Sequence, residues 1–230
     1  MPERFSLGRH IASRGDETVA VLGLGRFGSA VALELMASDV QVLGVDSSER
    51  TVQDMSTKLT HCVRADSTHE DALRQLGVQE FERAVVGIGT SIESNLLTAS
   101  LLKTLGVDNV WAKAISSAHG RILEQLGVDH VVYPENDMGR RVAHLVMGCM
   151  LDFIQFDPDY AMVKTAPPAT MLGKPLSETG VRSGHGVTIV GVKRPGGAFT
   201  HCTGETVLRS GDVVIASGLP RAVEKWSELG

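Results

Sequence analysis

The sequence predicts an α/β fold: a six-stranded parallel sheet covered by helices on both faces, then a crossover helix and a small α+β domain. Three observations support this prediction. Apolar runs of strand length alternate with stretches of helical period from Thr18 to about Tyr133. A glycine-rich turn joins the first apolar run to the first helical stretch. Beyond residue 159 the runs are shorter and Pro/Gly turns separate them.

The alternating region contains six expected strands and five expected helices. The strands are parallel because a helix connects each strand to the next, and such crossovers are right-handed. The expected strands are Val19–Leu22, Val40–Val45, Cys62–Ala65, Ala84–Ile88, Val110–Ala114 and His130–Tyr133, and the expected helices are Ser29–Ala37, Glu49–Leu59, Glu70–Leu76, Ser94–Leu105 and Ala118–Leu126.

Three of these helices are expected to end at the same triplet. Leu-Gly-Val occurs at 76–78, 105–107 and 126–128, each time between a helical stretch and an apolar run. Glycine readily adopts the left-handed backbone that closes a helix. The triplet therefore marks helix ends and carries no functional information.

The remainder of the chain has a different pattern. A helix is expected from about Glu135 to Met150, with Val142, Leu145 and Val146 on one apolar side, and a hinge or exposed crossover is expected at 151–159. Further strands are expected at Tyr160–Lys164, Val187–Lys193 and Asp212–Ala216, and short helices near Leu176–Thr179 and at Pro220–Leu229. The predicted parts are a flexible lead-in at 1–17, an α/β domain at 18–134, a crossover helix and hinge at 135–158, and a C-terminal domain at 159–230.

Composition and charge exclude several classes of protein. A net charge of -5 without a basic block, and an aromatic content of 4%, argue against nucleic-acid binding. The three cysteines, Cys62, Cys149 and Cys202, are far apart and lack zinc spacing, which indicates a reducing compartment. No apolar run reaches the roughly 18 residues of a membrane span, and the N-terminus lacks a signal peptide's apolar core. We therefore expect a cytoplasmic protein that meets a membrane only through a partner.

The turn after the first expected strand is the strongest functional signal. In Gly23-Leu-Gly-Arg-Phe-Gly28, Gly23 suits the tight turn, Gly25 lets the backbone approach a phosphate, and Gly28 lets the helix pack on the strand. The helix start presents free N–H groups to that phosphate. Asp46 ends the second strand, where a carboxylate accepts hydrogen bonds from a ribose hydroxyl. This combination predicts a Rossmann-like domain that binds an adenine nucleotide; the competing interpretation is a structural glycine turn with a capping aspartate.

Three charged side chains extend the predicted site. Arg26 lies at the positive end of the first helix, where a cation suits a polyphosphate bound by its own or a neighbouring subunit. Asp66 ends the third strand, from which it can reach ribose or adenine, and it also suits the N-cap of a helix over 67–76. Lys113 lies in the fifth strand, where a buried charge needs a phosphate or an acidic partner, unless it emerges at the strand tip.

Two further positions lie at element ends. Ile88-Gly89 ends the fourth strand and Asn95 opens the next helix, so the backbone there is expected to line the adenine side of the cleft. Glu135 opens the long helix, where an acid also complements the helix dipole.

Taken together, Gly23-Leu-Gly-Arg-Phe-Gly28, Asp46, Ala65-Asp66-Ser67-Thr68 and Tyr133-Pro134-Glu135-Asn-Asp-Met138 resemble the RCK/KTN family. Its members are the cytosolic regulatory subunits of Ktr- and Trk-type potassium uptake systems. The resemblance covers about residues 18 to 229, including a C-terminal part that looks like the family's RCK C-terminal domain. It implies subunits that pair into dimers, assemble into an octameric ring and dock on an integral-membrane potassium-translocating protein. It also implies regulation without catalytic turnover.

The resemblance further implies ligands. Family members bind ATP, ADP or NAD(H), and nucleotide exchange reshapes the ring and gates the membrane subunit. Arg26 would reach the terminal phosphate of a neighbouring subunit's nucleotide, and Glu135 would help to hold a cation, Mg²⁺, Ca²⁺ or Na⁺, between paired subunits. The implied nucleotide-binding set is Gly23, Gly25, Arg26, Phe27, Gly28, Asp46, Asp66, Ser67, Ile88, Gly89, Asn95 and Lys113.

In some relatives the C-terminal domain binds cyclic di-AMP at a dimer interface. Arg182, Thr188 and Ile189 fall where that site would be, although Thr188 stands where an amide side chain often occurs. Two other functions fit parts of the sequence. An NAD-dependent oxidoreductase would use the same glycine motif, but no catalytic residue set can be named for it. The other is a gating module on the same chain as its pore. The start at Met1 without a membrane span favours a separate subunit over this alternative.

Overall fold

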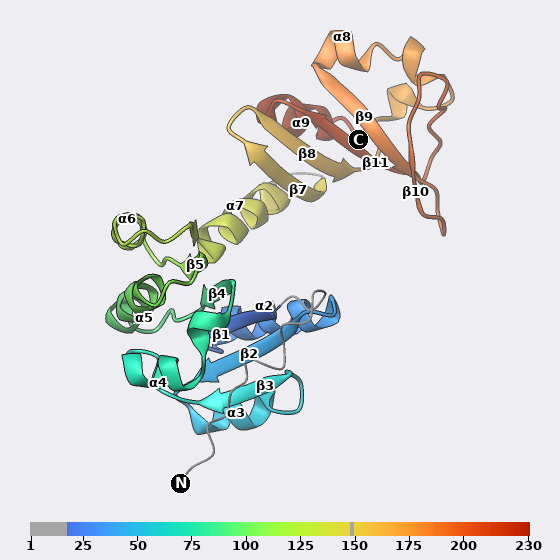
Figure 1. The fold of residues 1–230 in the computed structure, drawn as a ribbon. Helices are drawn as coiled ribbons and strands as arrows, with labels where there is room; N and C mark the ends of the chain where they lie inside the picture. The colour runs from blue at the N-terminus through green and yellow to red at the C-terminus, as the bar shows by residue number, and fades with distance from the viewer. Residues whose placement is uncertain (1–17, 148–149) are drawn as a thin grey trace. The chain divides into compact units, whose positions relative to one another are not determined.

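The computed structural model describes residues 18–147 and 150–230, which form two compact units divided between Glu135 and Asn136 (Figure 1). The lead-in expected at 1–17 lies outside the described residues. Each unit contains its own sheet and its own buried apolar residues, in two clusters in the first unit and one in the second. The predicted fold class, a doubly wound parallel sheet followed by a small α+β unit, is confirmed.

The first unit contains a six-stranded parallel sheet in the order β3-β2-β1-β4-β5-β6. The chain order reverses beside β1, between its two neighbours β2 and β4, and ligands bind at such a switch point in open parallel sheets. The strands are β1 (Thr18–Leu22), β2 (Gln41–Asp46), β3 (His61–Arg64), β4 (Arg83–Val86), β5 (Asn109–Lys113) and β6 (His130–Val132). The α-helices are α2 (Arg26–Ala37), α3 (Glu49–Met55), α4 (Glu70–Gln75), α5 (Ile92–Thr104) and α6 (Ser117–Gln125), with a 3₁₀ turn, η1 (Val78–Glu80).

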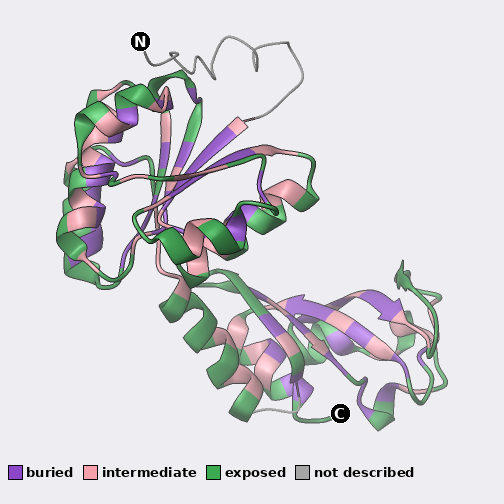
Figure 2. Ribbon diagram, turned by 90° about the horizontal axis from the view of Figure 1, so that it is seen from below, coloured by how far each residue is buried: buried purple, intermediate pink, exposed green. Residues whose placement is uncertain are grey.

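Alternate residues of the strands pack on opposite faces of this sheet. In β1, Val19 and Val21 belong to the cluster that includes Ala32 of α2 and Met55 of α3. The intervening Ala20 and Leu22 belong to the cluster beneath α4, α5 and α6. Because both faces are covered, the strands are apolar on both sides, as Figure 2 shows for the buried strands between two layers of helices.

The Leu-Gly-Val triplets end helices as predicted. Gly77, Gly106 and Gly127 all have positive φ, at 70°, 83° and 81°. Each donates its N–H to a carbonyl three residues earlier in the preceding helix or its cap. The left-handed glycine therefore closes the last turn and redirects the chain into the next segment.

The second unit consists of helix α7, which starts within the first unit at Pro134, and an antiparallel sheet in the order β10-β9-β11-β8-β7. Helix α7, the short helix near Leu176, three of the strands and the last helix were predicted, whereas β7, β10 and α8 were not. The long helix expected to reach Met150 ends at Met147, and Met150 is the first residue of β7. The elements are α7 (Pro134–Met147), β7 (Met150–Asp157), β8 (Tyr160–Thr165), η2 (Ala169–Met171), η3 (Leu176–Glu178), α8 (Val181–His185), β9 (Val187–Lys193), β10 (Phe199–His201), β11 (Val213–Gly218) and α9 (Pro220–Ser227).

The hinge predicted at 151–159 is wrong, because this segment is strand β7 and the tight turn to β8. Met150 and Phe153 are buried in the core of the second unit. Register shifts at Met150/Asp152 and at Gln155/Asp157 break the two-residue alternation along β7. A bulged strand lacks the strict period by which strands are recognised in a sequence, which is why the segment resembled a loop.

Helix α7 is attached to the second unit by polar contacts. The Arg141 guanidinium donates to both carboxylate oxygens of Asp152, at 2.8 and 2.7 Å. The His144 ring stacks on Phe153 at 4.0 Å, and its Nδ1 lies 2.8 Å from Glu224 Oε1 in α9. On the predicted apolar side, Leu145 packs on the core of this unit while Val142 and Val146 stay exposed. No helix in the described parts of the chain has the length and apolar character needed to cross a bilayer.

Candidate functional site

The glycine turn between β1 and α2 has the geometry that its sequence predicts. Gly23 has φ +89°, a conformation that side chains other than glycine rarely adopt. A Cβ on Gly28 would lie 1.9 Å from the Gly23 carbonyl oxygen, so only glycine permits this approach of α2 to the turn. A Cβ on Gly25 would meet no atom within 4 Å. The space beside Gly25, at the start of α2, is therefore open to a ligand.

Helix α2 begins at Arg26, three residues earlier than predicted. Gly25 is its N-cap, and no side chain caps the first turn. The first N–H groups of a helix have no partner within the helix, and they favour an anion. An uncapped start beside an open glycine is therefore suited to a phosphate group.

A cleft of about 400 Å³ lies at the carboxyl ends of β1 to β4, a volume within the range of small-molecule sites. Seven of the predicted nucleotide-binding residues line it: Gly23, Gly25, Asp46, Asp66, Ser67, Ile88 and Gly89. Its other polar lining includes residues outside the predicted nucleotide-binding set: Ser47, Ser48, Thr68, Thr90, Ser91 and Ser94. Ser48 and Ser91 are the N-caps of α3 and α5, and Ser94 lies in the first turn of α5.

Asp46 connects the glycine turn to the loop after β2. Its Oδ2 accepts the Leu24 N–H at 2.7 Å, and its Oδ1 accepts the Ser48 N–H at 2.8 Å. The carboxylate is half-buried and lines the cleft. A carboxylate offers about four lone-pair positions, so Asp46 retains acceptor capacity for a ribose hydroxyl. It organises the turn and also faces the ligand space.

Asp66 does not cap helix α4, which begins at Glu70 after His69 as its N-cap. Its Oδ1 instead accepts hydrogen bonds from the Thr68 N–H at 3.0 Å and the Thr68 hydroxyl at 2.7 Å. The backbone hydrogen bond, followed by the hydroxyl, lowers the pKa of Asp66 below its ordinary value. The helix-cap interpretation is wrong, and Asp66 is an ionised, exposed acceptor at the cleft.

Ser67 and Thr98 form a buried pair at the same side of the cleft. Their hydroxyl oxygens lie 2.9 Å apart, and the Thr98 side chain is fully buried in α5. Ser67 lines the cleft, but its hydroxyl already has a partner. The hydrogen bond ties the loop after β3 to α5.

The other predicted nucleotide residues, Arg26, Phe27, Gly28, Asn95 and Lys113, do not line the cleft. Arg26 is exposed and has no hydrogen bond or ion pair with any residue in 18–147 or 150–230. The Phe27 ring lies 5.8 Å from Lys113 Nζ. Gly28 is buried against the glycine turn, as described above. Arg26 is thus a cation at the start of α2 without a direct ion pair, although it lies near enough to Glu135 to contribute to the lowered pKa of that carboxyl, after the Lys113 hydrogen bond.

Lys113 has an acidic partner, one of the two possibilities that its position in a strand left open. Its Nζ donates to Glu135 Oε1 at 2.5 Å, and the lysine side chain is buried while that of Glu135 is exposed. This hydrogen bond is the main cause that lowers the pKa of Glu135. The pair joins the end of β5 to the first turn of α7.

Glu135 is not part of a metal-binding cluster of acidic, histidine or cysteine side chains within residues 18–147 and 150–230, where no three such side chains gather.

Asn95 is fully buried behind the cleft wall, and His119, which the sequence analysis missed, contacts it. Asn95 Nδ2 donates to the carbonyls of Ile88 and Lys113, at 2.7 and 3.1 Å. His119 Nε2 lies 3.2 Å from Asn95 Oδ1, and burial lowers the pKa of His119 below its ordinary value. A lone histidine in an amphipathic helix gives no sequence signal of this role.

The lowered pKa of His119 predicts a loss of stability in mild acid. As the pH falls through about 6.5 the unfolded imidazole takes up a proton. The folded imidazole stays neutral until a lower pH, so the unfolded state binds more protons and the free energy of unfolding decreases. We expect the free energy of unfolding to decrease less in His119→Gln than in wild type between about pH 7.5 and 5.5, as measured by urea unfolding. The exposed His61→Gln is the control, and equal pH slopes for wild type and His119→Gln would contradict the assignment.

A second cavity, of about 450 Å³, lies in the C-terminal unit. Arg182, Thr188 and Ile189, the predicted cyclic di-AMP residues, all line it. Arg182 Nε donates to the Thr188 hydroxyl at 3.2 Å, so the threonine orients the guanidinium beside the cavity. Leu176, Val181 and Cys202 add apolar lining.

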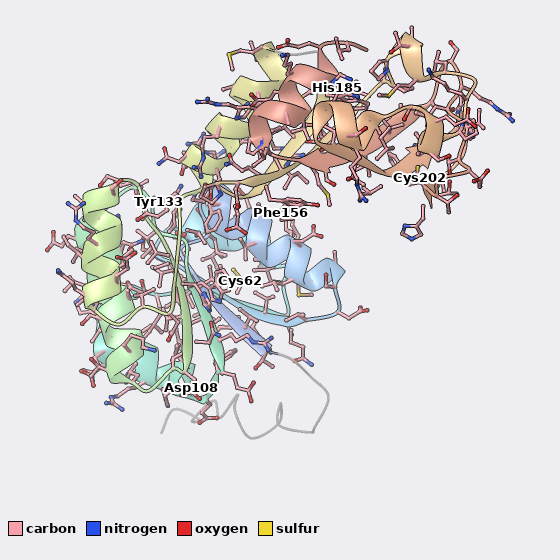
Figure 3. The ribbon with its side chains drawn as sticks, turned by 90° about the horizontal axis from the view of Figure 1, so that it is seen from above. Cys62, Asp108, Tyr133, Phe156, His185 and Cys202 are labelled. Carbon is pink, nitrogen blue, oxygen red and sulfur yellow. The ribbon has the colours of Figure 1, made fainter. Side chains whose placement is uncertain are left out.

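The described cysteines are half-buried thiols. Figure 3 labels Cys62 on β3 and Cys202 after β10, which belong to different units. Burial is the main cause that raises the pKa of each thiol. A raised pKa keeps a thiol protonated and weakly nucleophilic, so neither cysteine has the environment of a reactive residue.

Comparison with known proteins places both units in one family. The TrkA-N domain profile matches residues 19–134 and the TrkA-C domain profile matches residues 160–229. Ktr system potassium uptake protein C of Bacillus subtilis is 33% identical over 210 residues, covering 91% of this chain and 95% of the relative. Ktr system potassium uptake protein A of Vibrio alginolyticus is 34% identical over 205 residues, covering 89% and 93%.

A solved structure of the GsuK channel bound to NAD shares the fold. Its TM-score is 0.62 at 18% identity, over 95% of this chain and 39% of that protein, so this chain spans less than half of the channel. The identity is too low to show more than a common fold. Because both domain profiles match and two relatives exceed 30% identity over most of their length, the chain belongs to the RCK/KTN family of potassium uptake proteins, with a TrkA-N and a TrkA-C domain.

Proposed function

We propose that this chain is a regulatory subunit that binds an adenine nucleotide and controls potassium uptake through an integral-membrane partner. The observation that supports this proposal most strongly is the cleft, where the free space beside Gly25 and the uncapped start of α2 lie next to the Asp46 carboxylate. The relatives named as Ktr system potassium uptake proteins support the role in potassium transport. The proposed subunit has no catalytic turnover and acts in the cytoplasm, at the inner face of the membrane.

The proposed ligands are ATP and ADP, with NAD(H) as the alternative nucleotide. A phosphate chain would accept hydrogen bonds from the start of α2, and the ribose would donate to Asp46. The NAD-bound GsuK channel supports nucleotide binding on this fold. Binding changes the state of the protein only if the nucleotide has different affinities for two conformations. ATP and ADP differ by one phosphate, which is the group that a subunit sensing their ratio must contact.

The proposed assembly is a homo-oligomer of dimers that forms an octameric ring. The exposed Val142 and Val146 of α7 form an apolar surface that favours burial against another subunit. Glu135, at the start of the same helix, would contribute to a shared cation, Mg²⁺, Ca²⁺ or Na⁺, if a second subunit supplies further oxygen ligands. We also propose cyclic di-AMP as a candidate ligand of the cavity around Arg182.

A thermal-shift panel of the purified protein with ATP, ADP, NADH, NADPH and cyclic di-AMP tests this function. A ligand that binds the native state raises the midpoint of unfolding by mass action. We expect strong shifts with ATP and ADP and weak shifts with NADPH, whose 2′-phosphate Asp46 would repel. A shift with NADH or NADPH alone would favour the oxidoreductase interpretation instead.

Arg26 is predicted to distinguish ATP from ADP. An exposed guanidinium that forms no hydrogen bond or ion pair within the described residues can contact a terminal phosphate, bound either by its own subunit or by a neighbour. We expect Arg26→Ala to weaken ATP binding about tenfold and ADP binding much less, so that the ATP/ADP affinity ratio narrows. Isothermal titration calorimetry measures both affinities, and Arg50→Ala removes another exposed arginine of the same unit as the control. An unchanged ratio in Arg26→Ala would contradict this assignment.

A further inference from the structure

Asn95 joins the ends of two neighbouring strands behind the nucleotide cleft. Its two Nδ2 hydrogens are used on the carbonyls of Ile88, after β4, and Lys113, at the end of β5. The side chain is fully buried, so water does not compete for these hydrogen bonds. The Asn95 amide therefore fixes the distance between the loop after β4 and the last residue of β5.

His119 fixes the orientation of this amide. Its Nε2–H donates to Asn95 Oδ1 at 3.2 Å, while its Nδ1 accepts the Ile115 N–H at 3.4 Å. Only the neutral imidazole with its proton on Nε2 satisfies both contacts. His119 is buried in α6, and burial favours this neutral form. Both amide hydrogens of Asn95 and its Oδ1 consequently have a buried partner.

The two carbonyls held by Asn95 belong to two different functional parts. Ile88 and the following Gly89 line the cleft, and Gly87 is packed so closely that a Cβ there would lie 2.6 Å from the Gly23 carbonyl oxygen. Lys113 carries the ion pair with Glu135 at the start of α7. A Cβ on Gly89 would lie 3.2 Å from Lys113 Nζ, so the Lys113 ammonium lies close behind this part of the wall.

We propose that Asn95 and His119 are positioning residues that hold the β4–α5 wall of the nucleotide cleft in register with Lys113, and thereby couple nucleotide binding to the Lys113–Glu135 ion pair. This inference rests on the proposed nucleotide binding. A displacement of Ile88 or Gly89 by a bound nucleotide is transmitted through the Asn95 amide to Lys113. The start of α7 is then sensitive to the occupant of the cleft.

The first arm of the test measures ADP affinity by isothermal titration calorimetry, well below the unfolding midpoint of every variant. His119→Phe keeps a ring but removes both hydrogen bonds, and we expect ADP to bind at least about fivefold more weakly. His119→Gln retains an amide donor and acceptor and should restore most of the affinity. Leu123→Val, which shortens a buried side chain on the same helix, lowers stability without touching the network and is the matched control.

The second arm measures the coupling itself. NMR of the backbone amides, with Glu135 assigned by Glu135→Gln, follows the Glu135 amide signal with and without ADP at one fixed pH. We expect ADP to move the Glu135 amide signal in wild type and in Leu123→Val, and not in Asn95→Leu. Wild type that binds no nucleotide would overturn the proposed function and this inference with it. If wild type binds ADP but His119→Phe and Asn95→Leu give the same results as Leu123→Val, this inference is overturned and the proposed function is not.

Discussion

Gly28→Ala is expected to destabilise the nucleotide-binding unit more than any other single-methyl change in the glycine turn. The added Cβ would lie 1.9 Å from the Gly23 carbonyl oxygen and 3.0 Å from the Gly23 carbonyl carbon. Both atoms belong to the backbone, so no rotamer change relieves the contact and α2 must move off β1. We expect a loss of about 3 kcal/mol or more in the free energy of unfolding, measured by urea denaturation.

Gly25→Ala is the matched comparison, because the same methyl group is added two residues after Gly23 and three before Gly28. Its Cβ meets nothing within 4 Å, and the backbone has an ordinary negative φ of -65°. Stability should change by less than about 0.5 kcal/mol. The methyl group would nevertheless occupy the space beside the start of α2, so ATP and ADP should bind at least about tenfold more weakly. Unimpaired nucleotide binding by Gly25→Ala would show that the phosphate does not lie at this turn.

Asp46→Ala is expected to cause the largest loss of nucleotide affinity among the side-chain substitutions. The carboxylate holds the Leu24 and Ser48 N–H groups, and its removal leaves both without their charged acceptor. Hydrogen bonds to charged groups contribute roughly 1.5 to 3 kcal/mol each, and partial exposure lets water replace part of this. We expect the unit to lose about 2 kcal/mol of stability and ATP affinity to fall at least about tenfold, because the proposed ribose acceptor is also lost.

Asp54→Ala is the control for this change. Asp54 is an exposed carboxylate of α3 and lies outside the cleft. The Asp54→Ala substitution therefore removes the same charge without affecting the glycine turn. The free energy of unfolding and the ATP affinity should both stay close to the wild-type values. Calorimetric titration with ATP and urea denaturation of the two variants measure the comparison. Equal ATP affinity in the Asp46 and Asp54 variants would sink the assignment of Asp46 as a ligand contact.

The parallel sheet could be predicted in detail because its determinants are local. Each strand is a short apolar run, each helix has a helical period, and three helices end at a left-handed glycine that the Leu-Gly-Val triplets mark. The positions of Gly23, Gly28 and Asp46 follow from the same local pattern, since a strand, a turn and a helix in sequence define them. The main error in this unit was the Asp66 cap, where the helix begins three residues later than the motif suggested.

The C-terminal unit was harder to predict because its pattern is weaker. Strand β7 is bulged at two places, and β10 is a three-residue exposed edge strand, so neither shows the alternation of a half-buried strand. Their assignment comes from hydrogen bonds to the neighbouring strands β8 and β9, and the residue pattern within β7 or β10 does not reveal it. The sequence therefore indicated a hinge where the structure has the edge of a sheet.

What the sequence by itself determined was the chain's alternation, its glycine turn and the family to which both domains belong. What only the tertiary structure decided was which polar groups meet. Lys113 pairs with Glu135, 22 residues away, and His119 reaches Asn95, 24 residues away. These pairings depend on the lateral order of β4, β5 and α6 and on the depth of each side chain. Residue types and spacing determine periodicity along the chain, whereas contacts between separate elements arise only once the sheet has brought those elements together.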